Sequence, residues 1–293
     1  FLYQLFARAY GTNNFPDCSN MCHEASGYGL TSSIGIGKGT VEIDDFEKAD
    51  AVFVFGQNPG TNHPRMLETL KEVVQRGGQL ISFNTLHERG LERFQNPQNP
   101  IEMLTNGSKP TSTNYFCPKI GGDMAVVRGV VKVLIEMEDA AQKEGKAIFD
   151  HDFINQHTQG LEDYLKQVKQ TSWSDILQQS GLTKEDIVHT ANVYAKAESV
   201  IITWAMGITQ HHHSVATIHE IVNLLALRGN LGKPGAGACP VRGHSNVQGD
   251  RTMGINECPS PAFLDALEKR FQFTPPKEHG LADVDTIRAM RDG

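Results

Sequence analysis

The 293-residue sequence lacks a long apolar run and also lacks a run of basic residues. A membrane-spanning helix needs about 20 consecutive apolar residues, and no stretch here approaches that length. The formal net charge is -7, so neither a nucleic acid nor an anionic membrane is an expected partner. Hydrophobic residues make up 39% and charged residues 21% of the chain, as in an ordinary globular protein.

Cysteines are few and widely spaced, at positions 18, 22, 117, 239 and 258. An odd number at such spacing does not favour a disulfide framework, and reduced thiols in a cytoplasm are the simpler interpretation. Cys18 and Cys22 have no second close Cys or His pair nearby, so a tetrahedral zinc site is not predicted. A cytoplasmic location is therefore expected.

Strands and helices alternate along the chain. Continuous apolar runs at Ala51–Phe55, Gln79–Phe83 and Ser199–Trp204 predict buried parallel strands. Helices are expected at about 65–75, 122–137, 150–156, 184–197 and 215–228, and a long polar loop from Asn84 to about Gly121. This alternation predicts an α/β fold, a doubly wound, mostly parallel Rossmann-like sheet with helices on both faces and ligands at the carboxyl ends of its strands.

Two loops follow predicted strands, and neither carries the dinucleotide fingerprint G-x-G-x-x-G, so ordinary NAD binding has little support. Gly56-Gln57-Asn58 and Gly207 to Gln210 nevertheless stand where a nucleotide should bind. Small residues let a backbone approach a phosphate, and Gln and Asn side chains can pair with a purine or ribose. The alternative is that both are simply tight strand-to-helix turns, which are common.

The densest chemical stretch is DCSNMCHE, at positions 17–24. The Cys22 thiolate would suit a soft or mid-row metal, and His23 could take up a proton near neutral pH. The alternative is a partly buried cysteine beside a surface histidine. In the second dense stretch, PVRGHSNVQG, Arg242 could bind a small carboxylate through two parallel hydrogen bonds, or could sit in a surface ion pair.

Several segments, taken in order, resemble the molybdenum or tungsten oxidoreductases that carry bis-molybdopterin guanine dinucleotide, which include formate dehydrogenases and dimethyl sulfoxide reductase. GTNN and DCSNMCHE resemble the segment with the metal ligand, and VFVFGQNPGTNHPRM and WAMGITQHHH resemble the two cofactor loops. GGDMAVVRGV, GNLGKPGAGACPVRG and NVQG resemble the family's following helix and closing active-site segment. LHERGLERFQNPQNPIEML and SNMCHE are most similar to the subgroup of formate dehydrogenase alpha-subunit-like proteins.

The resemblance implies a role for each matching residue. Cys22 stands at the metal ligand, His23 at the catalytic histidine and Arg242 at the arginine that orients the substrate anion. Glu24 stands where formate dehydrogenases usually carry Gly. Implied cofactor contacts are Gly56, Gln57, Asn58, Asn84, Gly207, Thr209, Gln210, Gly243 and Asn246, of which Asn84 begins Asn-Thr-Leu where many members have Asp-Pro-Arg.

The implied activity is a two-electron oxidation of formate or a similar small anion. Electrons would leave through a 4Fe-4S cluster in an N-terminal module outside this sequence, toward an electron-transfer protein. Two alternatives stay open: a nitrate reductase-like molybdoenzyme, and a metal-free nucleotide-binding or interaction module.

The expected organisation has three parts: residues 1–16 as the end of a preceding domain, 17–244 as the Rossmann-like cofactor-binding domain, and 245–293 as the start of a return into a neighbouring domain. The sequence starts at Phe1 inside a helical pattern. It is therefore expected to be the central fragment of a longer chain and to be inactive alone.

Overall fold

The computed structural model describes residues 1–105, 107–244 and 246–293, which form two compact units. The first, here called the sheet unit, comprises Ala25–Val241. The second, here called the terminal unit, joins Phe1–Glu24 to Arg242–Gly293. These boundaries differ by several residues from those expected at 16/17 and 244/245, and Ser245 lies outside the described residues.

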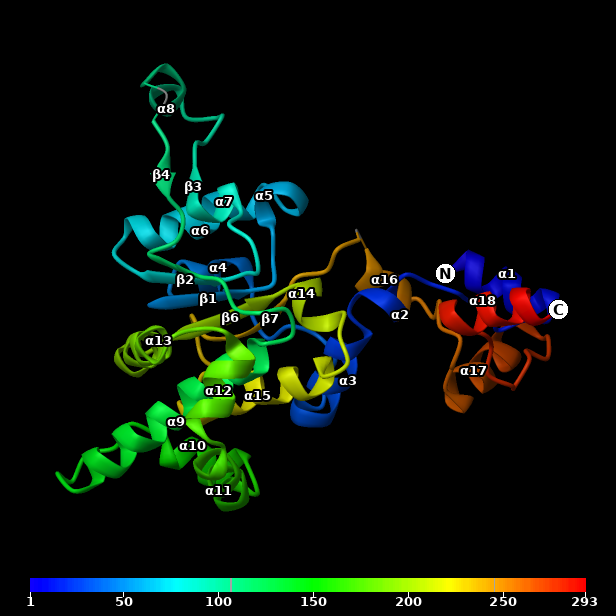
Figure 1. Ribbon diagram of the computed structural model, residues 1–293. Helices are drawn as coiled ribbons and strands as arrows, with labels where there is room; N and C mark the ends of the chain where they lie inside the picture. Colours follow the sequence, from blue (N-terminus) through cyan, green and yellow to red (C-terminus); the bar gives the residue numbers. More distant parts are fainter. Residues whose placement is uncertain (106, 245) are drawn as a thin grey trace. The chain divides into compact units, whose positions relative to one another are not determined.

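The sheet unit is built on five strands in the order β5-β2-β1-β6-β7, all paired in parallel. The strands are β1 (Ala51–Phe55), β2 (Gln79–Phe83), β5 (Asn114–Phe116), β6 (Val200–Trp204) and β7 (Gly237–Pro240). In the central register, Phe53 lies opposite Ile81 on one side and Ile202 on the other. The predicted fold class is therefore confirmed, with the three apolar runs at its centre (Figure 1).

Both faces of the sheet are covered, which explains why its central strands are apolar throughout. Along β1, Val52 and Val54 pack toward α4 (Ile43–Phe46) and α6 (Met66–Gln75). Phe53 and Phe55 belong to the opposite core. That core is closed by α9 (Asp123–Gln142), α12 (Trp173–Ser180), α13 (Lys184–Lys196) and α15 (Ser214–Leu227) (Figure 1).

The expected helices are present with small shifts in their ends. The structure adds α3 (Glu24–Ile34), α5 (Pro59–Asn62), α11 (Leu161–Gln170) and α14 (Met206–Thr209) around the sheet, and the helix expected at 150–156 is α10 (His151–His157). Helix α13 begins with a capping box, in which the Thr183 hydroxyl accepts from the Asp186 N–H at 3.2 Å and the Thr183 N–H donates to the Asp186 carboxylate at 3.1 Å. The cap fixes where α13 starts.

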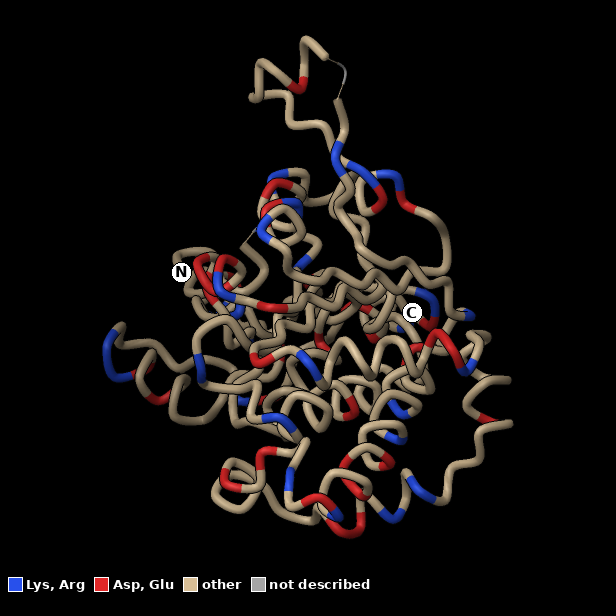
Figure 2. The backbone as a smooth tube through the Cα atoms, turned by 90° about the vertical axis from the view of Figure 1, so that its left-hand side faces the viewer, with Lys and Arg blue, Asp and Glu red and all other residues tan. Residues whose placement is uncertain are grey.

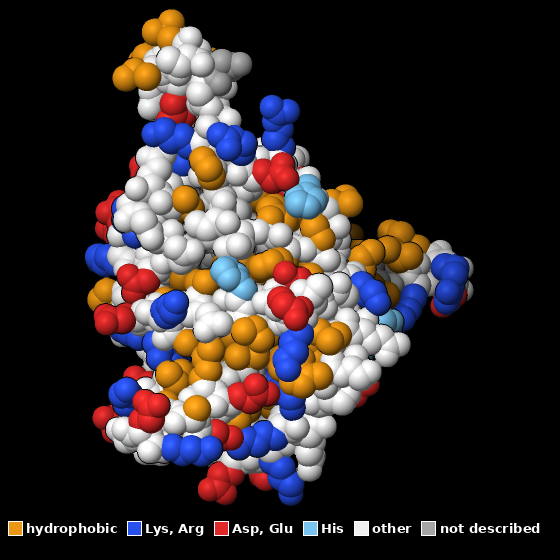
Figure 3. Space-filling model, turned by 60° about the vertical axis from the view of Figure 1, so that its left-hand side comes forward, with side chains coloured by type: hydrophobic (Ala, Val, Ile, Leu, Met, Phe, Trp, Pro, Cys, Tyr) orange, Lys and Arg blue, Asp and Glu red, His pale blue; other side chains and the backbone are white. Residues whose placement is uncertain are grey.

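The prediction of one long loop from Asn84 to Gly121 is wrong. This stretch contains β5, α7 (Arg89–Glu92) and an arm made of β3 (Arg93–Phe94), α8 (Pro100–Thr105) and β4 (Lys109–Pro110). These elements are too short to show a clear hydrophobic period in the sequence. Buried Lys71 donates to Glu102 at 3.2 Å and so ties the arm to α6. Figure 3 shows hydrophobic side chains at the end of the arm and Lys and Arg near its base.

The terminal unit contains α1 (Leu2–Tyr10), α2 (Ser19–Cys22), α16 (Val247–Thr252), α17 (Pro261–Phe271) and α18 (Asp283–Asp292). Buried Arg8 joins its two chain segments by donating to the carbonyl oxygens of Gly254 and Asn256, both at 2.9 Å. The Asn13 amide does the same with the carbonyl oxygens of Pro276 and Glu278. These contacts make one unit of two segments that are far apart in the sequence.

Charged side chains of both signs occur along the chain, although β1, β2 and β6 carry none. Figure 2 shows Lys and Arg interspersed with Asp and Glu along the backbone. Within the described ranges, no helix combines the length and the apolar character that crossing a membrane would require.

Candidate functional site

The first group of predicted site residues lies between β1 and β6, where the order in which the chain adds strands to the sheet reverses. From β1 the chain crosses to β2 and β5 on one side, whereas from β6 it crosses to β7 on the other. Such a switch point leaves a crevice at the carboxyl ends of the two central strands, which is where open α/β sheets bind ligands. The loops after β1 and β6 begin there, as the sequence predicted.

Two glycines bring these loops into backbone contact. The Gly207 N–H donates to the Gly56 carbonyl at 3.1 Å, which extends the pairing of β1 and β6 beyond the strands. A Cβ on Gly207 would lie 2.5 Å from the Cα of Gly56. Gly56 also has a φ of 55°, in the left-handed region that favours glycine. Both glycines are therefore required by the geometry of the switch point.

The Gln57 side chain turns into the protein. It is 1% exposed, its carbonyl oxygen accepts from the Thr203 hydroxyl at 3.1 Å, and its amide nitrogen donates to the Met66 sulfur at 3.0 Å. This buried side chain is therefore held by contacts within the sheet unit, and its contact with a cofactor stays a prediction.

Asn58 and Asn84 shape the loops around Gln57. The Asn58 side chain caps α5 by accepting from the Thr61 N–H at 3.2 Å, and it donates to Glu88 at 2.7 Å. The Asn84 amide donates to the Gln57 carbonyl at 3.2 Å and so links the loops after β1 and β2. Contacts from these residues to a cofactor stay predictions, as they do for Thr209 and Gln210 at the end of α14.

Sequence reasoning did not select Asp123, although it is the first residue of α9 and follows the loop after β5. Its side chain is buried, and burial raises the pKa of this carboxyl to about 6, against an opposing hydrogen bond from its own backbone N–H. A carboxyl group with such a pKa is a candidate for a functional site. The signal in the sequence was one acidic residue between Gly-Gly and a long apolar helix.

The second group of predicted residues lies in the terminal unit. The Asp17 carboxylate accepts from the Ser19 N–H at 2.8 Å and starts the short helix α2. Cys22 ends this helix, its N–H donating to the Cys18 carbonyl at 2.9 Å. Cys22 is 4% exposed and His23 is 2% exposed. The predicted ligand and histidine are thus held in a protected turn and not on an open surface.

Arg242 comes to this turn from the far end of the sequence. Its Nη1 donates to the carbonyl oxygen of His23 at 3.1 Å. Burial lowers the pKa of Arg242, and the nearby Cys22 opposes that shift. The structure therefore brings together the three residues predicted to be catalytic, Cys22, His23 and Arg242. The alternative of a surface arginine in an ion pair does not describe this contact.

Gly243 and Asn246 follow Arg242 in the same unit. Asn246 adopts a left-handed backbone with a φ of 63° and precedes α16. Its side chain lies over Gly249, where a Cβ would meet the Asn246 side-chain oxygen at 2.0 Å. Any side chain at position 249 would collide with Asn246, so glycine is required there. Contact of the NVQG stretch with a cofactor stays a prediction.

Cys22 is the one metal ligand that the sequence predicted at this turn. Among the residues that the structure describes, no three His, Cys, Asp or Glu side chains group as a metal site. One soft thiolate suits a metal whose other ligands come from a sulfur-bearing cofactor. The donors present therefore fit the implied metal-pterin group and do not suit a metal held by protein side chains alone.

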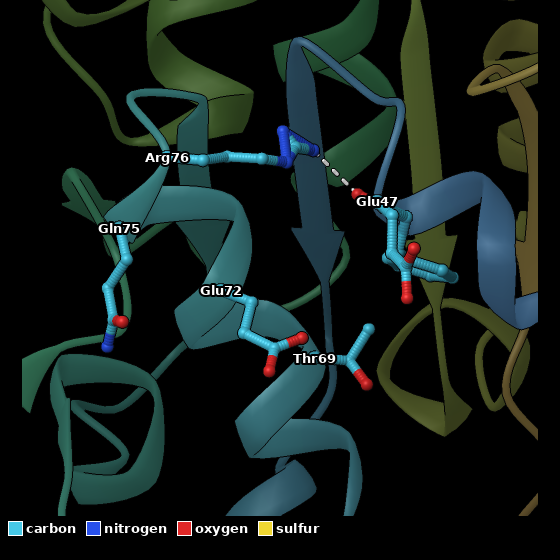
Figure 4. A pocket seen from close by; sticks show the side chains of 6 residues that line it. Glu47, Thr69, Glu72, Gln75 and Arg76 are labelled. Atoms are coloured by element: carbon cyan, nitrogen blue, oxygen red, sulfur yellow. Dashed lines mark hydrogen bonds between the residues drawn. The ribbon is translucent and has the colours of Figure 1, made fainter.

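Figure 4 shows a pocket in a different part of the sheet unit, lined by Glu47, Thr69, Glu72, Gln75 and Arg76. Arg76 points across it and donates to the carbonyl oxygens of Phe46 and Ala49, both at 2.6 Å. Glu47 lies directly after α4, and the other four lining residues lie in α6 or directly after it, outside the loops that follow β1 and β6. The pocket therefore does not belong to the strand-end loops.

Comparison with known proteins shows the family of this chain. The family model for molybdopterin oxidoreductase matches residues 1–277. Protein YdeP of Escherichia coli strain K12 is 53% identical over 294 residues, covering 100% of this chain and 39% of YdeP. Formate dehydrogenase H of the same strain is 32% identical over 255 residues, covering 87% of this chain and 32% of that protein. This chain thus spans 32% to 39% of the length of these relatives.

Among solved structures, acetylene hydratase from Pelobacter acetylenicus matches with a TM-score of 0.61 and 18% sequence identity. The match covers 80% of this chain and 28% of that chain. At this identity the likeness concerns the fold.

Proposed function

Because this chain belongs to the molybdopterin oxidoreductase family, we propose that it forms part of a molybdenum or tungsten enzyme that oxidises formate or a similar small anion by two electrons. The cofactor of this proposal is bis-molybdopterin guanine dinucleotide. When bound, it supplies the redox chemistry, and the protein supplies binding, orientation and electrostatics.

The observation that supports this proposal best is the approach of Arg242 to Cys22 and His23 within one unit. A guanidinium binds a planar carboxylate through two parallel hydrogen bonds. Arg242 uses Nη1 on the His23 carbonyl, and this contact fixes its position beside the thiolate. An anion held by Arg242 would then lie next to the metal ligand.

Each of the three residues has a separate role in the proposal. Cys22 donates its thiolate to the metal, Arg242 binds the negative end of the substrate, and His23 accepts the proton that the oxidation releases. The burial of His23 keeps bulk water away from that proton. The strand-end loops that begin at Gly56 and Gly207 would hold the guanine dinucleotides.

Glu24 favours a particular kind of substrate. Burial raises the pKa of this carboxyl, and Glu257 adds to the shift, while the Asn20 amide donates to it at 3.1 Å and opposes the shift. A carboxylate next to His23 repels an anion. A small substrate with one negative charge, bound at Arg242, therefore fits better than a dianion.

The proposal extends to parts outside this chain. A 4Fe-4S cluster would carry electrons from the pterins to an electron-transfer protein, and the whole enzyme would work in the cytoplasm. These elements rest on the family resemblance.

Elemental and pterin analysis of the full-length protein tests the cofactor, and dye reduction with formate tests the reaction. We expect two pterins and one molybdenum or tungsten per chain, and no formate-dependent dye reduction in Cys22→Ala. Nitrate-dependent oxidation of a reduced viologen, without activity on formate, would instead identify a nitrate reductase-like enzyme. Full-length protein that contains neither metal nor pterin would identify a metal-free module.

A further inference from the structure

We infer that Arg251 and Glu257 are positioning residues, which clamp the turn that carries Cys22 and His23 against the segment that follows Arg242. The inference deepens the proposed function, because it rests on Cys22 as the metal ligand. All residues involved belong to the terminal unit.

Arg251 reaches the Cys22 turn directly. It lies in α16. Its Nε donates at 2.6 Å to the hydroxyl of Ser19, which is the first residue of α2. Its Nη1 donates to a Glu257 carboxylate oxygen at 2.7 Å. One guanidinium therefore connects the start of the Cys22 helix to two residues near the other end of the sequence.

Glu257 completes the connection from the opposite side. Its second carboxylate oxygen accepts from the Asn20 amide at 2.9 Å. The same Asn20 nitrogen donates to Glu24 at 3.1 Å. Glu257 therefore binds Arg251 with one oxygen and Asn20 with the other. Helix α2 is thus held at Ser19 by Arg251 and at Asn20 by Glu257.

The ion pair is shielded from water, so its geometry is restricted. The Glu257 side chain is 9% exposed and that of Arg251 is 24% exposed. Burial raises the pKa of Glu257, but hydrogen bonds from its own backbone N–H, Arg251 and Asn20 outweigh this and hold the pKa below its usual range. A buried carboxylate stays charged only while such partners remain in place.

Hydrogen bonds hold the chain both before and after Cys22, the proposed metal ligand. The Arg251–Glu257 clamp holds Ser19 and Asn20 before Cys22, and Arg242 holds the His23 carbonyl after it. A thiolate at the end of a four-residue helix has little local support of its own. The clamp would supply that support from α16 and would fix Cys22 relative to Arg242.

The test measures the reactivity of Cys22 in the absence of metal. The full-length protein is made in a host that cannot synthesise molybdopterin, and the iodoacetamide alkylation rate of each cysteine is followed by mass spectrometry. Cys22 is 4% exposed and should react slowly in the wild type. We expect Arg251→Gln and Glu257→Gln to raise its rate about tenfold, which corresponds to about 1.4 kcal/mol. Arg251→Lys, which restores a positive charge beside Glu257, should give a smaller increase.

Matched controls separate a local effect from unfolding. Arg288→Gln breaks an exposed Arg–Asp pair at 3.3 Å in the same unit and should leave the Cys22 rate unchanged. The Cys239 side chain is partly exposed, but burial of its thiol raises the pKa to about 11, so it should stay unreactive in every variant. Asn20→Ala keeps the ion pair intact and should also speed alkylation of Cys22.

Two results would overturn the clamp: an unchanged Cys22 rate in Arg251→Gln, Glu257→Gln and Asn20→Ala, or a parallel rise at Cys22 and Cys239. Because this readout requires neither metal nor turnover, it can fail while the proposed oxidation is confirmed, and the reverse also holds.

Discussion

Arg242 donates a hydrogen bond to the carbonyl oxygen of His23 at 3.1 Å, although 219 positions separate the two residues in the sequence. The contact is the structural basis for treating Cys22, His23 and Arg242 as one site. It fixes the arginine through a backbone atom, so it does not depend on the protonation of the His23 ring.

Replacing Arg242 tests its role in binding the substrate. Arg242→Lys keeps the charge but loses the planar fork, so we expect the KM for formate in the full-length enzyme to rise by about tenfold or more. Metal content should stay at the wild-type level, because the ligand is Cys22. An unchanged KM would show that the anion binds elsewhere.

Glu24→Gln should act in the opposite direction. Removing a carboxylate next to His23 reduces repulsion of an anion, and we expect the KM for formate to fall about threefold. The control is Glu185→Gln, which removes an exposed carboxylate from α13 in the sheet unit. A KM that rises in Glu24→Gln but not in the control would mean that Glu24 helps to bind the substrate.

Gly207→Ala should destabilise the sheet unit. The added Cβ would lie 2.5 Å from the Gly56 Cα, so the loops after β1 and β6 must separate. We expect a loss of about 1–3 kcal/mol in the free energy of unfolding, measured with urea. Gly27→Ala is the control, since its Cβ would have no neighbour within 4 Å and alanine favours helix α3. Equal stability in Gly207→Ala and the wild type would contradict the close packing.

Asp123→Asn should remove a pH dependence of stability. Burial raises the pKa of Asp123 from 3.8 to about 6, so the folded protein keeps this proton more tightly than the unfolded chain does. Stability should therefore fall as the pH rises from about 4 to about 6, and the ionised carboxylate should cost up to about 3 kcal/mol above that window.

The measurement for Asp123 is a series of urea unfolding curves from pH 4 to pH 8. At pH 4 the wild type and Asp123→Asn should be similar, because both side chains are neutral. At pH 8 the variant should be more stable. The same difference at both ends of the range would mean that Asp123 has an ordinary pKa.

The central strands could be predicted because their residues are almost all apolar, which indicates burial. Ala51–Phe55, Gln79–Phe83 and the run ending at Trp204 are apolar on both faces, and the structure buries both faces. The edge strands were missed. Asn114–Phe116 has three residues and Gly237–Pro240 begins with Gly and ends with Pro, so neither shows a strand pattern.

Site residues could be selected by type, but their contacts could not be predicted. The sequence suggested that the Gln57 side chain contacts a ligand. In the structure, this amide is hydrogen-bonded to Thr203 and Met66. Arg251 and Glu257 look like ordinary surface charges in the sequence. Their importance appears only when the chain brings them to Ser19 and Asn20, more than 230 positions away. Such long-range partners carry no local signal.

X-ray absorption at the molybdenum or tungsten edge tests the central claim most directly, by comparing the full-length wild type with Cys22→Ser. If Cys22 is the protein ligand, the variant should lose one sulfur neighbour of the metal and lose formate-dependent dye reduction. A metal whose sulfur coordination is the same in both proteins would contradict the account.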